Sequence, residues 1–211
     1  MASLHQWLSF TLIALFVTLT PGPAVILALS NSLALGPVRA MISSLGNALG
    51  LVIVASATIT GLGALLMASA TAFIALKIAG AGYLIYLGIK QWRAKSSALG
   101  IERGVPQSVP AIRLFLRGLS VALTNPKAIL FFIAFLPQFI EPGAWHATQA
   151  AVLIATFAGC SVAAHIFYVL LAQRLKRYLS STPRQQAMNR LFGASFIGLG
   201  LSLFALKNRT A

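Results

Sequence analysis

Six long apolar stretches alternate with short polar segments along this chain. Each stretch is near or above the roughly 20 residues that a helix needs to cross a bilayer. The pattern therefore predicts an all-α integral membrane protein with six transmembrane helices. The expected spans are Trp7–Leu29, Ala40–Met67, Ala72–Ile89, Leu114–Ile140, Ala147–Ala172 and Leu191–Leu206.

Prolines interrupt the first and the fourth stretch within similar phrases. Leu-Thr-Pro-Gly-Pro at 19–23 is echoed, 104 residues later, by Leu-Thr-Asn-Pro-Lys at 123–127. A proline inside a helix removes a backbone donor and clashes with the preceding turn, so we expect both helices to be broken. Lipid tolerates an opened backbone only where it faces protein or a wet cavity. Breaks at matching places in two halves indicate the binding site of a transporter.

Composition and charge agree with a membrane protein. Hydrophobic residues make up 58% of the chain and charged residues 9%, against about 25% charged in a soluble domain. Twelve of the 16 Lys and Arg residues fall in the first, third and fifth loops between spans. The positive-inside rule then places these loops in the cytoplasm and both termini outside. Cations so placed contact anionic lipid headgroups, and no basic soluble module indicates a nucleic-acid partner.

The repeated phrase also predicts how the chain is organised. Three spans per half give the halves opposite orientations, so their likeness implies two inverted three-helix repeats. A weaker likeness between residues 77–84 and 190–197 supports the duplication. We expect one membrane transporter domain over 1–211, with repeats at 1–90 and 113–211 and a basic cytoplasmic linker at 91–112.

The two breaks are the candidate substrate site. The N-terminus of a half-helix carries partial positive charge suited to a carboxylate, and Thr20 and Thr124 stand where a hydroxyl can cap one. Lys127 is costly at membrane depth unless it reaches the headgroups or faces a cavity, where it could bind a substrate carboxylate or stabilise the opened backbone. The candidate substrate-binding residues are Thr20, Pro21, Gly22, Pro23, Asn47, Thr124, Asn125, Pro126 and Lys127.

Two polar residues of other spans complete the candidates. Asn47 lies between Gly46 and Gly50, a pattern of close helix packing, and its amide could bond a neighbouring helix or line the path. The same glycines could serve a homodimer or internal packing. His165 is the only imidazole deep in an expected span. It could titrate in a proton-coupled carrier, or it could be a neutral side chain bonded to a backbone carbonyl.

Other chemistries find little support. The chain has no HExxH, P-loop or GxGxxG motif, and its two acids cannot supply a catalytic pair plus structural charges, so we expect no enzyme activity. One cysteine and three scattered histidines do not predict a metal site, and no cofactor is expected. A carrier for metal cations or other small solutes, and a membrane scaffold subunit without transport, stay open as alternatives.

At these residues the chain resembles the LysE/RhtB family of bacterial amino-acid exporters. The resemblance rests on Thr-Pro-Gly-Pro at 20–23, on the glycines and tyrosines of 46–50 and 77–88, and on Asn-Pro-Lys-Ala at 125–128. Glycines at 193 and 198 extend it over nearly the whole chain. It implies efflux of amino acids or close derivatives, such as homoserine, threonine or lysine, across the bacterial inner membrane on a proton or ion gradient.

One departure from the family changes the expected substrate. Many family members carry an aspartate in the fifth span where this chain has His165. The resemblance then implies that His165 takes over the proton role or that the substrate preference differs. Because no buried anion is left for a cationic substrate, we expect neutral amino acids such as homoserine and threonine, exported by alternating access.

Overall fold

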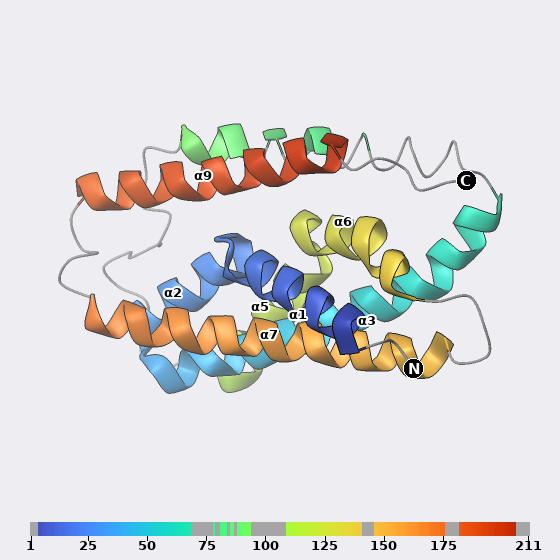
Figure 1. Cartoon of the computed structure of the whole chain (residues 1–211). Helices are drawn as coiled ribbons and strands as arrows, with labels where there is room; N and C mark the ends of the chain where they lie inside the picture. The colour runs from blue at the N-terminus through green and yellow to red at the C-terminus, as the bar shows by residue number, and fades with distance from the viewer. Residues whose placement is uncertain are drawn as a thin grey trace.

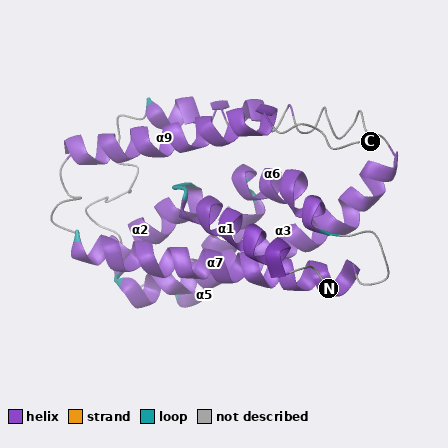
Figure 2. Cartoon of the chain, in the orientation of Figure 1, coloured by secondary structure: helices purple, strands orange, loops and turns teal. Residues whose placement is uncertain are grey.

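The computed structural model describes residues 4–68, 78, 81–83, 85–86, 88–93, 109–140, 146–175 and 182–205. Every regular element among them is helical, as the all-α prediction requires (Figure 2). The elements are α1 (Leu4–Leu19), α2 (Pro23–Leu35), α3 (Pro37–Ala68), α5 (Ala111–Leu123), α6 (Pro126–Phe135), the 3₁₀ helix η1 (Leu136–Phe139), α7 (His146–Arg174) and α9 (Thr182–Ala205).

Four of the expected spans have counterparts among these elements. Within the described residues, Pro37–Gly61 of α3 and Ala147–Arg174 of α7 are each long and apolar enough to cross a membrane. The pair α1 and α2 adds a third span if the two helices are counted as one, and the pair α5 and α6 adds a fourth. The first and fourth spans are thus bent, as the prolines predict.

The third and sixth expected spans have less complete counterparts among the described elements. The third, Ala72–Ile89, and the linker at 91–112 lie largely outside the described residues. The sixth was expected from Leu191, whereas α9 already begins at Thr182. Its first turns are polar, with Pro183 near the start where proline fits a helix. These polar turns continue the helix by about two turns before the apolar stretch on which the expected span rests.

Glycines bring α3 and α5 into backbone contact, and no other pair of described elements packs as extensively. A Cβ on Gly46 would overlap the carbonyl oxygen of Phe115, and one on Gly118 would overlap that of Ser43. Gly50 likewise faces Leu119. Small residues permit such close approach between membrane helices. Gly46 and Gly50 therefore serve internal packing, and a homodimer stays a prediction.

An aromatic cluster holds α1, α6 and α7 together. The Phe157 ring of α7 lies 4.8 Å from that of Phe131 and 4.7 Å from that of Phe132, measured between centroids. Phe10 of α1 joins from the other side, with its ring centroid 5.2 Å from that of Phe139 in an edge-to-face arrangement. Such pairs add about 0.5–1.5 kcal/mol each beyond the burial of their surface. The helices that carry the two breaks are thus fixed on α7.

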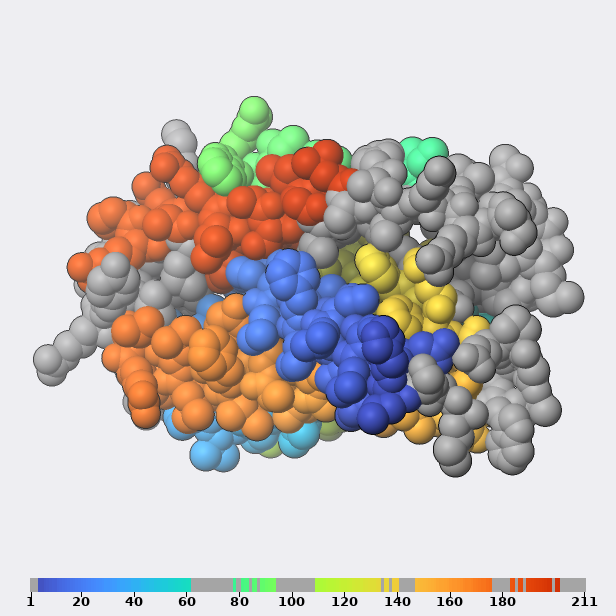
Figure 3. Space-filling model, viewed as in Figure 1, coloured from blue at the N-terminus to red at the C-terminus, as the bar shows by residue number. Residues whose placement is uncertain are grey.

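The helix α9 forms a separate layer along one side of the bundle, next to described parts of 78–93 (Figure 1). Gly88 and Gly193 meet there, since a Cβ on Gly193 would come within 2.6 Å of the Gly88 carbonyl oxygen. Phe192 of α9 is buried with Val25 of α2 and Ala172 of α7. On the face seen in Figure 3, α1 and α2 lie between α7 and α9.

Candidate functional site

The first break separates α1 from α2 by a bend of 56°. The helix α2 begins at Pro23, whose fixed φ suits the first helical position. Gly22 precedes it in an extended conformation, and no side chain caps the N-terminus of α2. The hydroxyl of Thr20 instead donates to the Phe16 carbonyl, 2.7 Å away in its own helix. The expectation that Thr20 caps the second half-helix is therefore wrong.

The second break bends α5 against α6 by 48° and has a cap of its own. The side-chain oxygen of Asn125 accepts a hydrogen bond from the backbone amide of Lys127 at 3.1 Å, and Pro126 begins α6. Asparagine is among the best N-cap residues because its short side chain reaches these free amides. Thr124 donates to the Ser120 carbonyl at 2.8 Å instead. The cap expected from Thr124 is thus supplied by its neighbour.

The side chain of Lys127 crosses from the second break to the first. Its Nζ donates to the Thr20 carbonyl at 2.6 Å and to the Val17 carbonyl at 3.0 Å. The residue is only 7% exposed, so the ammonium does not reach out to headgroups. A Cβ on Gly22 would stand 3.2 Å from this Nζ, which shows that Lys127 occupies the space a side chain at 22 would take. Of the roles predicted for Lys127, this geometry matches the stabilisation of the opened backbone.

A tyrosine of α7 also donates a hydrogen bond at the first break. The hydroxyl of Tyr168 donates to the Leu19 carbonyl at 2.6 Å. The last carbonyls of a helix have no intrahelical partner. Three carbonyls at the end of α1, those of Val17, Leu19 and Thr20, are therefore satisfied by side chains from α6 and α7. Sequence reasoning missed Tyr168; the only signal was its spacing, three residues after His165 on one face of a helix.

Asn47 and His165 lie in a buried polar row next to this arrangement. The Asn47 amide of α3 donates to the Ser161 hydroxyl of α7 at 3.3 Å, which is the helix-to-helix bond foreseen for it. His165 is 3% exposed and stands one turn beyond Ser161. Two buried atoms of the row, Asn47 Oδ1 and His165 Nδ1, have no hydrogen-bond partner among the described residues. Such atoms are expensive to leave unpaired.

The arrangement offers complementary charges within a short distance. Lys127 and the uncapped N-terminus of α2 are positive, whereas the carbonyls that end α1 carry the negative end of a helix dipole. The acids of the chain, Glu102 and Glu141, both lie outside the described residues. Among the described residues, no group of three or more His, Cys, Asp or Glu could hold a metal ion. The described groups suit a small zwitterion better than a metal ion.

Apolar helices of membrane-spanning length, with two broken helices joined through a buried lysine, define a multi-pass membrane transporter. The LysE type translocator family matches residues 15–207. The chain belongs to this family, as the resemblance predicted, and it is a multi-pass protein of the inner membrane. No solved structure matches the chain.

Curated relatives align over almost their entire length. A membrane protein of Vibrio cholerae is 35% identical over 97% of this chain and 98% of its own. A homoserine/homoserine lactone efflux protein of Salmonella typhimurium is 35% identical over 96% of this chain and 97% of its own. A leucine efflux protein of the same organism is 29% identical, over 97% of each chain.

Proposed function

We propose that the chain is a secondary-active exporter of neutral amino acids, such as homoserine and threonine, across the bacterial inner membrane. Export draws on the proton gradient and proceeds by alternating access. The observation that carries the proposal is the Lys127 side chain, which links the two helix breaks by donating to two backbone carbonyls. Within the described part of the chain this lysine has no acidic partner, so a buried cation there is ready to exchange its ligands for a carboxylate.

Substrate binding is an exchange at the first break. The α-carboxylate of the substrate attracts Lys127 and the N-terminus of α2, and Lys127 then leaves the Thr20 and Val17 carbonyls. The α-ammonium of the same substrate molecule then binds these carbonyls in place of the Lys127 ammonium, because the C-terminal end of α1 favours a cation. Gly22 leaves room for the exchange, and Pro21 and Pro23 keep the backbone open. At the second break, Asn125 and Pro126 place Lys127 so that its side chain lies beside the first break. Thr124 precedes Asn125 in the sequence.

This exchange explains why the substrate would be an amino acid with an uncharged side chain. A zwitterion leaves the charge of the site unchanged, whereas the second ammonium of lysine would need an anion that no described residue supplies. Relatives named for efflux of homoserine and of leucine support the choice, since neither amino acid has a charged side chain. Asn47 lines the path from α3 through its unpartnered oxygen.

Proton coupling resides in His165. The imidazole is buried, and among the described residues its Nδ1 has no hydrogen-bond partner, which leaves this nitrogen available to a proton. Displacement of Lys127 by a substrate changes the field at His165, which links substrate binding to proton binding. The replacement His165→Gln tests this link. Export driven by a pH gradient should stop, whereas exchange of labelled for unlabelled substrate at equal pH on both sides should continue. Loss of both, in folded protein, would refute a role limited to coupling.

Contacts between helices support two inverted repeats at 1–90 and 113–211. The second span, α3, packs on the fourth, and the fifth span, α7, packs on the first. If each span is replaced by its counterpart in the other half, the contact of the second span with the fourth becomes the contact of the fifth span with the first. The likeness is partial, because α2 packs on α3 in the first half without a comparably close pair of described helices in the second. Rocking of one repeat against the other, about a linker at 91–112, would expose the breaks to each side in turn.

Counterflow in proteoliposomes tests the proposed activity. Vesicles loaded with unlabelled homoserine, threonine, leucine or lysine are diluted into each labelled amino acid, and uptake is followed. Transient accumulation of the neutral amino acids supports the proposal, whereas accumulation of lysine alone would refute the neutral substrate. Silence for every amino acid, from folded protein, would favour a carrier of other small solutes or metal cations, or a scaffold without transport.

A labelling experiment separates a carrier from a scaffold. In a Cys160→Ala background, Asn47→Cys places the sole thiol on the proposed path. A transported amino acid should slow its reaction with a small maleimide, whereas a cysteine in place of Ile53, half-exposed on the same helix, should react at an unchanged rate. Equal rates at both positions with and without amino acids would contradict a path along Asn47.

A further inference from the structure

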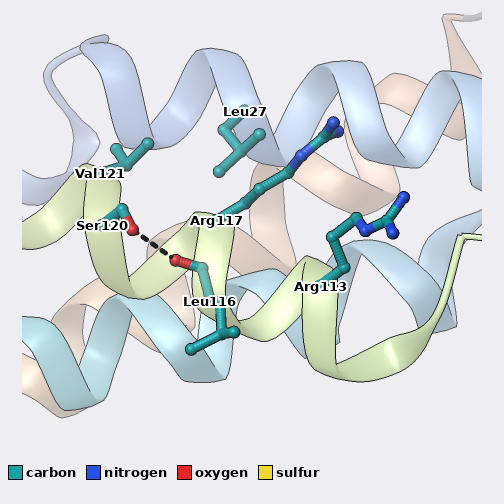
Figure 4. A pocket seen from close by; sticks show the side chains of 6 residues that line it. All are labelled: Leu27, Arg113, Leu116, Arg117, Ser120 and Val121. Atoms are coloured by element: carbon teal, nitrogen blue, oxygen red, sulfur yellow. Dashed lines mark hydrogen bonds between the residues drawn. The ribbon is translucent and has the colours of Figure 1, made fainter.

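A groove between α2 and α5 lies outside the arrangement just described. It has a volume of about 500 Å³ and is lined by Leu27 of α2 and by five residues of α5, namely Arg113, Leu116, Arg117, Ser120 and Val121 (Figure 4). It exists because α2 and α5 pack only loosely on each other, while α5 turns Leu114, Gly118 and Ala122 towards α3. The groove is thus formed by the outward face of α5 and one side of α2.

Two arginines give this groove its charge. Arg113 and Arg117 are one helical turn apart, and their guanidinium groups lie on the same side of α5 (Figure 4). Neither has an acidic partner within the described part of the chain, since both glutamates fall outside it. The hydroxyl of Ser120 donates to the Leu116 carbonyl at 2.8 Å and so does not contribute a free donor. The remaining lining is aliphatic, from Leu27, Leu116 and Val121.

We propose that this groove binds the headgroup of an anionic phospholipid. Guanidinium groups bind phosphate through paired hydrogen bonds, and the aliphatic side chains offer a surface for the beginning of the acyl chains. Basic pockets between transmembrane helices bind such headgroups in membranes. An amino acid fits less well, because the two guanidiniums would repel its ammonium while no described acid attracts it. The net charge of +14 favours an anionic occupant further.

Native mass spectrometry on the purified full chain tests this assignment. The probes are phosphatidylglycerol and phosphatidylethanolamine with the same acyl chains. The groove variant is Arg113→Gln with Arg117→Gln, and its control is Arg174→Gln with Arg190→Gln, which removes two exposed charges outside the groove. The groove variant should bind phosphatidylglycerol about 30-fold more weakly, since each cation near anionic lipid contributes roughly fivefold. The control should lose much less affinity than the groove variant, because its two arginines do not share a lined groove.

Further arms identify the occupant. If the groove variant does not purify as folded protein, Val121→Trp keeps both charges, fills the groove and should also weaken phosphatidylglycerol binding. Equal affinity for the two lipids, or equal loss in the control, would overturn the proposal. Displacement of the lipid by millimolar inorganic phosphate would assign the groove to a soluble anion, and displacement by homoserine would assign it to the transport path. Either displacement refutes a lipid site.

Discussion

The two helix breaks have similar sequences but are stabilised in different ways. Each bends its span by about 50° and starts the next helix at a proline. The second break is self-contained, because Asn125 caps the helix that follows. The first has no such cap, and the carbonyls that end its α1 are satisfied by Lys127 and Tyr168, which come from distant parts of the chain.

This difference assigns different roles to the two halves. In the proposed exchange, the second break stays fixed and presents a cation, whereas the side chains that are bound at the first break leave it. A substrate that competes for those side chains would act on the first break and hardly on the second. The asymmetry arises at a few positions, since the N-cap position is a glycine, Gly22, in α2 and an asparagine, Asn125, in α6.

The largest expected effect comes from removing the link between the breaks. Lys127→Met keeps an unbranched side chain that is one atom shorter and removes its charge. Export of homoserine or leucine should fall at least about 10-fold, because a hydrogen bond to a charged group contributes about 1.5–3 kcal/mol. Initial rates in proteoliposomes at equal protein content measure the effect. Lys90→Met, at an exposed position, is the control and should export normally; equal rates in the two variants would remove Lys127 from the site.

The next effect should come from filling the space that Lys127 occupies. In Gly22→Ala the new methyl group would stand 3.2 Å from Nζ and 3.3 Å from Cε of Lys127. Because overpacking costs about 1–3 kcal/mol, export should fall roughly fivefold or more. Gly159→Ala serves as the control, since a Cβ there meets nothing within 4 Å. An unaffected Gly22→Ala would show that the ammonium can leave its carbonyls without loss.

A smaller effect should separate the two neighbours at the second break. Asn125→Ala removes the cap of α6 and should destabilise the protein by about 1 kcal/mol. Thr124→Ala removes a hydroxyl that donates only within its own helix, so its melting temperature should stay close to that of the unaltered chain. Thermal unfolding in detergent compares the two variants. If Thr124→Ala were the more damaging, the assignment of the cap would be wrong.

An effect of about the same size should come from the second support of the first break, the Tyr168 hydroxyl. Tyr168→Phe loses one hydrogen bond to the Leu19 carbonyl, a contribution of about 1 kcal/mol, which corresponds to roughly fivefold in export if it fixes the break. The exposed Tyr86→Phe is the matched control. A loss as large as that of Lys127→Met would mean that the two side chains act as one unit.

Local sequence effects explain what could be predicted of the breaks. Proline acts on its own turn, so the positions of both breaks follow from Pro21, Pro23 and Pro126. The choice of cap did not follow from threonine alone. Within a helix, a threonine hydroxyl can donate to the carbonyl four residues before it, as Thr20 and Thr124 do, and it is then not available as a cap. Asparagine at 125 was the better candidate for this reason.

The side-chain hydrogen bonds that stabilise the first break could not be predicted from sequence. Lys127 contacts Val17 and Thr20 across 110 and 107 positions, and Tyr168 contacts Leu19 across 149. Such contacts depend on how α1, α6 and α7 pack, which no local pattern determines. The apolar stretches located the helices, but their ends shifted where polar turns continue a helix, as at Thr182 of α9.

The central claim is that Lys127 leaves the first break to hold a substrate carboxylate. Its most direct test compares homoserine with 3-amino-1-propanol, the same molecule without its carboxylate, as inhibitors of counterflow in two proteins. The unaltered chain should bind homoserine at least about 10-fold more tightly, and Lys127→Met should bind the two compounds almost equally. A preference of the same size in both proteins would contradict the claim.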